Sequence, residues 1–118
     1  MLSLRLIPLA VLFCVGACRP TLPSATTADA DRAAQTWPGT TVADLEHGRQ
    51  IYLERCSSCH QPVAPAKVAP ANWPGHIAEM KTRAHLSEEQ AQLVKRYVVT
   101  MSRAHAEGRA APQPQASR

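Results

Sequence analysis

Five consecutive residues, Cys56-Ser57-Ser58-Cys59-His60, constrain this 118-residue chain more than any other part of its sequence. Two thiols three residues apart can each add to one of two vinyl groups on a porphyrin, which forms two thioether bonds. The histidine that follows directly can then coordinate the porphyrin iron from the proximal side. The run is the attachment signature of c-type haem. We therefore expect one covalent haem c, held by Cys56 and Cys59, with His60 as an axial ligand of the iron.

Other sites that use paired cysteines fit the surrounding sequence less well. A thioredoxin-like redox pair needs a βαβ setting, whereas the segments on either side of Cys56 have helical spacing and no β-rich runs. A zinc site needs two further thiolate or imidazole ligands at metal spacing, and the remaining cysteines, Cys14 and Cys18, lie near the N-terminus. A structural disulfide between Cys56 and Cys59 leaves His60 without a role.

The N-terminus, residues 1–17, is predicted to be an export signal. Arg5 precedes an apolar stretch that is shorter than the roughly 20 residues of a membrane-spanning helix. The stretch ends in Val15-Gly16-Ala17-Cys18, which resembles the lipobox of bacterial lipoproteins. We expect Cys18 to carry the lipid and to anchor the protein on the periplasmic side of a bacterial membrane. Ordinary signal cleavage after Ala17, which gives a soluble periplasmic protein, and an uncleaved anchor are the alternatives.

Composition divides the rest of the chain into three parts. Residues 18–41 are rich in Pro, Thr, Ala and Asp with little apolar periodicity, which predicts a disordered tether with a mean span of about 25 Å. Residues 104–118 contain Gly108, Pro112 and Pro114 and are predicted to be a disordered tail. The remaining residues 42–103 form one small domain. A domain of this size has a marginal core, which a buried haem would enlarge.

The charge of the chain gives weaker information. The net charge is +4 and the pI is about 9.2, but two haem propionates bring the loaded protein closer to neutral. The balance therefore gives only weak support for an acidic partner surface. The sequence has no stripe of basic residues interleaved with aromatic residues, so we expect no nucleic-acid binding.

Three helices are predicted within residues 42–103, which gives an all-α domain. The first runs over 42–55, with Thr41 as N-cap and Asp44 in the first turn. The second is a short helix over 72–80 that begins with a cap at Asn72. A Pro/Ala-rich loop over 61–71 connects these two helices.

The last helix begins with the capping-box residues Ser87 and Gln90. An apolar stripe at helical spacing then follows, formed by Leu93, Val94, Tyr97, Val98 and Met101. The stripe indicates that this helix buries one face in the core.

The spacing Gly48-x-x-x-Tyr52-x-x-x-Cys56-x-x-Cys59-His60 resembles the first helix and haem site of class I c-type cytochromes. The resemblance covers about residues 42–101. It implies a small all-α, three-helix fold wrapped around one haem, and transfer of single electrons. It also implies that Gly48 allows the first and last helices to cross closely, with Tyr97 as the partner, and that Tyr52 packs near the haem edge.

Met80 is the predicted distal ligand, because Trp73, Ile77 and Met80 follow at i, i+4 and i+7 and share one helix face. His76 is the main competitor, and His85 is a weaker one. Met101 lies at the end of the core stripe, so packing is its preferred role. The interval from His60 to Met80 is shorter than in most class I cytochromes and lacks their Tyr/Pro-rich segment before the ligand, so the chain resembles a short-loop variant.

The sequence thus predicts a membrane-tethered monohaem cytochrome that carries single electrons between periplasmic redox proteins. It is interpreted as an electron carrier rather than an enzyme, because no nucleophile and base pair accompanies the haem motif. A haem domain that binds or senses ligands at an open sixth site is one alternative. An electron-relay subunit of a larger oxidoreductase is another.

Overall fold

The computed structural model describes residues 22–110, and this part of the chain is all-helical, as the sequence predicts. Its helices are α1 (Thr27–Ala34), α2 (Val42–Cys56), α3 (Trp73–Arg83) and α4 (Glu88–Ala110), with two short 3₁₀ helices, η1 (Pro65–Lys67) and η2 (Pro70–Asn72). None of the helices within this range is long and apolar enough to cross a membrane. The predicted export signal and Cys18 lie outside the described residues.

Local sequence signals set the starts of α2 and α4. The Thr41 hydroxyl accepts a hydrogen bond from the Asp44 amide at 3.1 Å, and the Asp44 carboxylate accepts one from the Thr41 amide at 2.8 Å. These bonds hold the pKa of Asp44 below its usual value. Ser87 and Gln90 form the same reciprocal pair at α4, with distances of 3.1 and 3.0 Å. The predicted capping box at Ser87 and the predicted N-cap at Thr41 are therefore confirmed, and Asp44 completes a second capping box that was not predicted.

The start of α3 differs from the prediction. The Asn72 side chain makes no capping hydrogen bond, because η2 precedes α3 directly and leaves Asn72 with helical backbone angles (φ −90°, ψ −21°). An N-cap normally has extended backbone angles. Pro74 in the first turn of α3 replaces the cap as the starting signal, since its fixed φ suits that position.

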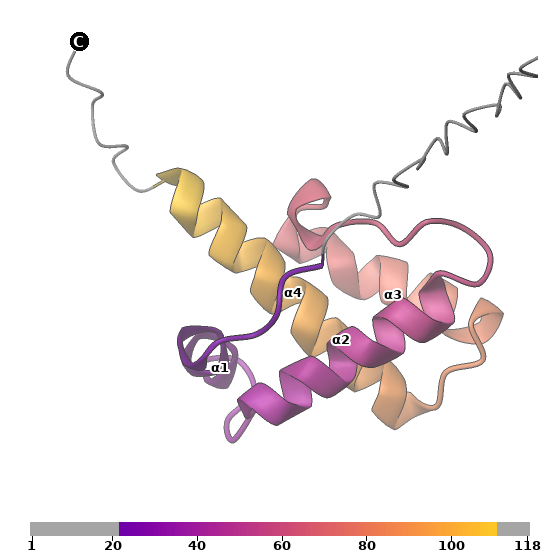
Figure 1. Cartoon of the computed structure of the whole chain (residues 1–118), viewed down its shortest axis with the longest axis horizontal. Helices are drawn as coiled ribbons and strands as arrows, with labels where there is room; N and C mark the ends of the chain where they lie inside the picture. The colour runs from indigo at the N-terminus through magenta and orange to yellow at the C-terminus, as the bar shows by residue number, and fades with distance from the viewer. Residues whose placement is uncertain (1–21, 111–118) are drawn as a thin grey trace, which may run out of the picture.

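Helix α4 is the centre of the fold (Figure 1), and it contacts every other helix of the described chain. Its largest contact is with α2. Four residues of the predicted stripe on α4 are buried: Val94, Tyr97 and Val98 have no exposed surface and Met101 is only 5 % exposed. Leu93 is half-buried and packs against this core.

The close crossing of α2 and α4 depends on Gly48. A Cβ atom at this position would lie 2.7 Å from the carbonyl carbon of Leu93 and still closer to its oxygen, with the Tyr97 Cβ at 3.1 Å. The two distances to the Leu93 carbonyl are shorter than real Cβ contacts, and this carbonyl is backbone that cannot rotate away. The crossing that the class I resemblance implied is therefore present, with Tyr97 beside it.

Two segments that the sequence predicts to be disordered contain helix. Within the predicted tether over 18–41, the structure has α1 and a buried Leu22. Within the predicted tail over 104–118, α4 continues to Ala110. The physical reason is tertiary packing: Leu22 and Ala33 are buried, and α1 contacts α4, where the Arg32 guanidinium pairs with the Glu107 carboxylate at 2.8 Å.

We predict that Gly48→Ala destabilises the folded protein by about 3 kcal/mol, because the added methyl group forces α2 away from α4. Gly108→Ala is the matched control, since a Cβ at this position on α4 has nothing within 4 Å. That change should stabilise the protein by up to about 1 kcal/mol through helix propensity. Urea unfolding of the two haem-loaded variants measures both effects. Equal stabilities would show that the crossing is not limited by Gly48.

Candidate functional site

A cavity of about 310 Å³ opens between the C-terminal end of α2 and helix α3. On the α2 side its lining residues are Tyr52, Arg55, Cys56, Ser58, Cys59 and His60. On the other side they are Val63 and Val68 of the connecting loop, Trp73, His76, Ile77, Met80 and Arg83 of α3, and Ala84 at its end. The cavity thus brings the Cys-x-x-Cys-His residues together with the predicted distal residue Met80, although 20 residues separate His60 from Met80 in the sequence.

The end of α2 positions the two thiols. Cys56 is the last residue of α2 and is half-buried, whereas Cys59 is exposed in the turn that follows. Ser57 donates its hydroxyl to the Leu53 carbonyl, and Ser58 donates to the Arg55 carbonyl at 2.9 Å. These bonds satisfy carbonyl groups of the last helical turn. Burial raises the pKa of the Cys56 thiol and so favours its neutral form.

The ring of His60 is oriented by its own neighbour. Its Nδ1 atom lies 2.8 Å from the Gln61 carbonyl oxygen. Because a carbonyl can only accept, Nδ1 carries the proton and donates it, and Nε2 keeps a free lone pair. This is the arrangement that metal-binding histidines use, with one nitrogen donating to a backbone carbonyl and the other facing the metal.

Helix α3 supplies the opposite wall. Trp73 and Ile77 are buried and Met80 is half-buried, and all three line the cavity, as their shared helix face predicts. His76 also lines the cavity, with its ring 6.0 Å from that of Trp73.

The other two candidates for the distal position lie elsewhere. His85 is exposed in the turn between α3 and α4, with a positive φ of 52°, and it does not line the cavity. Met101 is buried in the core and does not line the cavity either. Geometry therefore leaves Met80 and His76 as the two residues that face the His60 side.

Three side chains from three helices hold the loop that closes the cavity. Tyr52 of α2 donates to the Val63 carbonyl at 2.7 Å, and burial raises the pKa of its phenol, which keeps it a donor. The Trp73 indole of α3 donates to the Pro65 carbonyl at 3.2 Å. Ser102 of α4 donates to the Val68 carbonyl at 2.6 Å. No sequence pattern predicts these pairings, because they join side chains of different helices to backbone carbonyls of the loop.

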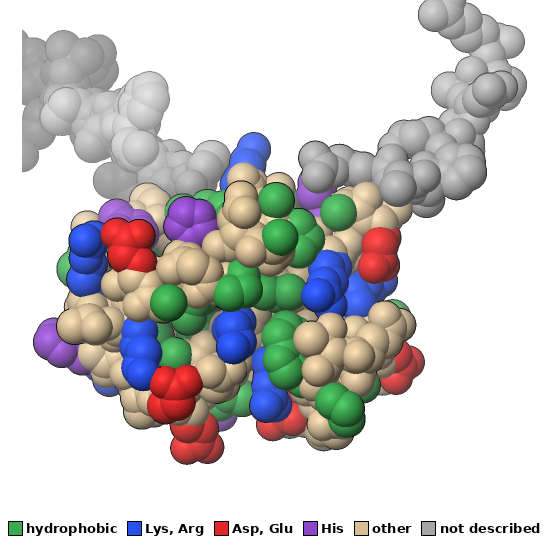
Figure 2. Space-filling model, turned by 180° about the vertical axis from the view of Figure 1, so that it is seen from behind, with side chains coloured by type: hydrophobic (Ala, Val, Ile, Leu, Met, Phe, Trp, Pro, Cys, Tyr) green, Lys and Arg blue, Asp and Glu red, His purple; other side chains and the backbone are tan. Residues whose placement is uncertain are grey.

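The residues of the cavity fit a c-type haem. Two free thiols and a correctly oriented imidazole lie on one side, while an apolar wall with a thioether lies on the other. Two cations that the sequence analysis did not select, Arg55 and Arg83, also line the cavity. Their sequence signals are adjacency to Cys56 and a position one helical turn after Met80. Helix α3 lies on the far side of Figure 1; on the face seen from behind in Figure 2, Lys and Arg side chains lie beside exposed hydrophobic ones.

Comparison with known proteins gives one family. The family model described as dihaem cytochrome c matches residues 52–117, which is more than half of the chain and includes the Cys-x-x-Cys-His run, α3 and α4. Helix α1 and residues 42–51 of α2 precede the matched region. The chain has no significant match among curated proteins or solved structures.

We predict that Ser102→Ala destabilises the protein by about 1 kcal/mol, because it leaves the Val68 carbonyl without its donor. Thr100→Val is the matched control two residues earlier on α4. The Thr100 hydroxyl is buried without a hydrogen-bond partner among the described residues, so its replacement by a methyl group should be neutral or stabilising. Thermal unfolding of both variants measures these changes in stability. A larger loss for Thr100→Val than for Ser102→Ala would contradict this account of the loop.

Proposed function

Since the chain belongs to the dihaem cytochrome c family, a group of c-type cytochromes that carry out haem-based electron transfer, we propose that it is a membrane-tethered electron carrier with one haem. It passes single electrons between redox proteins on the periplasmic side of a bacterial membrane. The observation that carries the proposal is the cavity in which Cys56, Cys59 and His60 face the α3 residue Met80. A carrier rather than a catalyst is the interpretation that agrees with the family.

The number of haems is a point on which the sequence and the family name differ. The family is described as dihaem, whereas the 118 residues contain one Cys-x-x-Cys-His run. The two remaining cysteines, Cys14 and Cys18, are four residues apart, and Arg19 rather than histidine follows the second. We propose one covalent haem c on this basis.

The chain's own residues divide the work at the site. Cys56 and Cys59 would hold the haem through thioether bonds, and His60 would bind the iron through Nε2, since its Nδ1 donates to the Gln61 carbonyl. Met80 is the proposed ligand on the other side. The haem supplies a one-electron couple, and a thioether ligand raises its potential relative to nitrogen or oxygen ligands. The buried Trp73 and Ile77 of α3 would limit the access of water to a haem bound in the cavity.

The covalent attachment has a direct test. Mass spectrometry of the mature protein should give the polypeptide plus one haem after acid–acetone extraction. Cys56→Ala and Cys59→Ala should each leave at most one thioether bond and lower the yield, because the small core depends on the haem. If haem extracts freely from the native protein, the haem is not covalently attached and this proposal is wrong. A mass gain of two haems would show that the family's dihaem state applies to this chain.

We predict that Met80→Ala abolishes the weak near-infrared charge-transfer band of the oxidised protein, which arises from sulfur bound to ferric iron. The same change should lower the reduction potential and open the site to carbon monoxide. Met101→Leu is the matched control, because it is a nearly volume-conserving change of a methionine outside the cavity.

Each of the other outcomes selects a different ligand set. Loss of the band in Met101→Leu but not in Met80→Ala would identify Met101, and not Met80, as the distal ligand. A spectrum that changes only in His76→Ala would indicate bis-histidine ligation and a low-potential carrier. Carbon monoxide binding by the unmodified protein would favour the alternative of a ligand-binding or sensing domain.

A further inference from the structure

The segment before α2 carries contacts that the haem site does not use. We call residues 22–41 the N-terminal clasp. At its start, Leu22 is buried in the hydrophobic core with 3 % of its surface exposed. The Leu22 carbonyl accepts a hydrogen bond from the Arg49 guanidinium at 3.1 Å, and the Pro23 carbonyl accepts one from the Tyr97 hydroxyl at 2.8 Å. The clasp is therefore tied to both helices of the central crossing.

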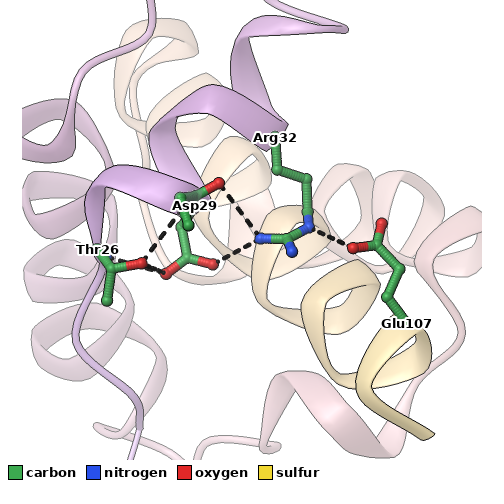
Figure 3. Close-up of polar contacts among 5 residues, drawn as sticks. Thr26, Asp29, Arg32 and Glu107 are labelled. Carbon is green, nitrogen blue, oxygen red and sulfur yellow. Dashed lines mark hydrogen bonds and ion pairs between the residues drawn. The ribbon is translucent and has the colours of Figure 1, made fainter. Parts of the chain in front are cut away.

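Helix α1 ties the middle of the clasp to the far end of α4. The Asp29 carboxylate closes a capping box with Thr26 and also pairs with Arg32 at 2.9 Å. The same Arg32 guanidinium reaches the Glu107 carboxylate of α4 at 2.8 Å (Figure 3). Ala33 on the next position is 1 % exposed. Helix α1 thus packs as part of the domain.

Near the end of the clasp, a third contact joins it to α4, where the Arg103 guanidinium donates to the Thr36 hydroxyl at 2.7 Å. Contacts to α2 or α4 therefore occur at the start, the middle and the end of the clasp. Nearly the whole segment that composition predicts to be a flexible tether belongs to the folded domain.

This placement changes the distance between the proposed lipid and the domain. Only residues 19–21 separate Cys18 from the buried Leu22, and four residue steps of fully extended chain span at most about 14 Å. A flexible tether over 18–41 would instead allow a mean span of about 25 Å and a far larger extended reach. The domain is held close to whatever surface holds Cys18.

We propose that, because the clasp is part of the folded domain, only residues 19–21 connect the lipid on Cys18 to it. We call this short connection the leash, and it keeps the haem domain at the membrane surface. Its redox partner is accordingly a protein embedded in or anchored to the same membrane. The inference rests on the proposed lipidation of Cys18 and on the proposed electron transfer. Its physical basis is effective concentration: a short leash keeps the haem domain in the thin layer that membrane-bound partners share, and each increase in leash length dilutes it.

Trypsin distinguishes the clasp from a tether in the full lipidated chain on vesicles. Trypsin cleaves after Lys and Arg but not before Pro, so the Arg19–Pro20 bond is resistant and the first cleavable bond after Cys18 is Arg32–Ala33. In a disordered tether this bond is cut at once, which releases a haem fragment that begins at Ala33. In the clasp, we expect Arg32–Ala33 to remain intact and the haem to remain on the vesicles.

Two variants calibrate this measurement. A flexible Gly/Ser linker of about 20 residues with one central Arg, inserted between Thr21 and Leu22, should be cut and should release an intact haem domain. Leu22→Ala should weaken the clasp and speed cleavage after Arg32 several-fold. Release of the unmodified protein at the rate of the linker variant, with a fragment that begins at Ala33, would overturn the inference.

The partner class is tested with a ruthenium polypyridyl photoreductant in two forms, one tethered to a lipid of the same vesicle and one dissolved in water. We expect the linker insertion without its Arg to slow haem reduction by the lipid-tethered form several-fold and to leave reduction by the dissolved form unchanged. Equal rates with the lipid-tethered form for both proteins would overturn the inference that the leash selects membrane-bound partners.

The failures of the two proposals can be told apart in the same samples. Haem that extracts freely from folded, haem-containing protein contradicts the proposed covalent attachment, whereas the trypsin pattern of the same folded protein still reports on the clasp. If haem-loaded protein is soluble before trypsin is added, the proposed lipidation of Cys18 is wrong and the leash proposal is overturned. The electron-transfer proposal is unaffected by this outcome. The same outcome would make a soluble periplasmic carrier the better description.

Discussion

The approach of two backbones at Gly48 is the constraint on which the rest of the structure depends. Because a side chain at this position would collide with the Leu93 carbonyl, α2 and α4 can be this close only with glycine at the crossing. The crossing fixes where α2 ends relative to α4, and with it where Cys56 and the following turn face the cavity. The clasp is bound to the same two helices, through Arg49 and Tyr97 on either side of the crossing.

The parts of the fold that could be predicted from the sequence are those set by neighbouring residues. Thr41 with Asp44, and Ser87 with Gln90, are local pairs whose hydrogen bonds need no tertiary structure. Helix α1 has an equally local box, Thr26 with Asp29, but its apolar residues are all alanines, which give little sign of a core-facing side. Its position depends on tertiary contacts with α2 and α4, among them the buried Ala33 and the pair of Arg32 with Glu107, which are 75 residues apart. No local sequence pattern predicts such contacts.

The same division applies to the candidate site. The proximal half is one contiguous run, so Cys56, Cys59 and His60 could be assigned from residue order alone. The distal half depends on how α3 packs, and the sequence could only place Met80 and His76 one turn apart on the same helix. Met80 and His76 both line the cavity, whereas His85 and Met101 do not. The packing therefore narrows the candidates for the distal ligand to Met80 and His76 but does not decide between them.

The loop between His60 and α3 has a consequence for how solvent reaches the site. Its carbonyls are held by side-chain donors from three helices rather than by a continuous backbone ladder, so few bonds must break for it to move. Segments held in this way open at a lower free-energy cost than the helices beneath them. The loop is therefore the part of the cavity wall that local opening should move most easily, without global unfolding of the helices.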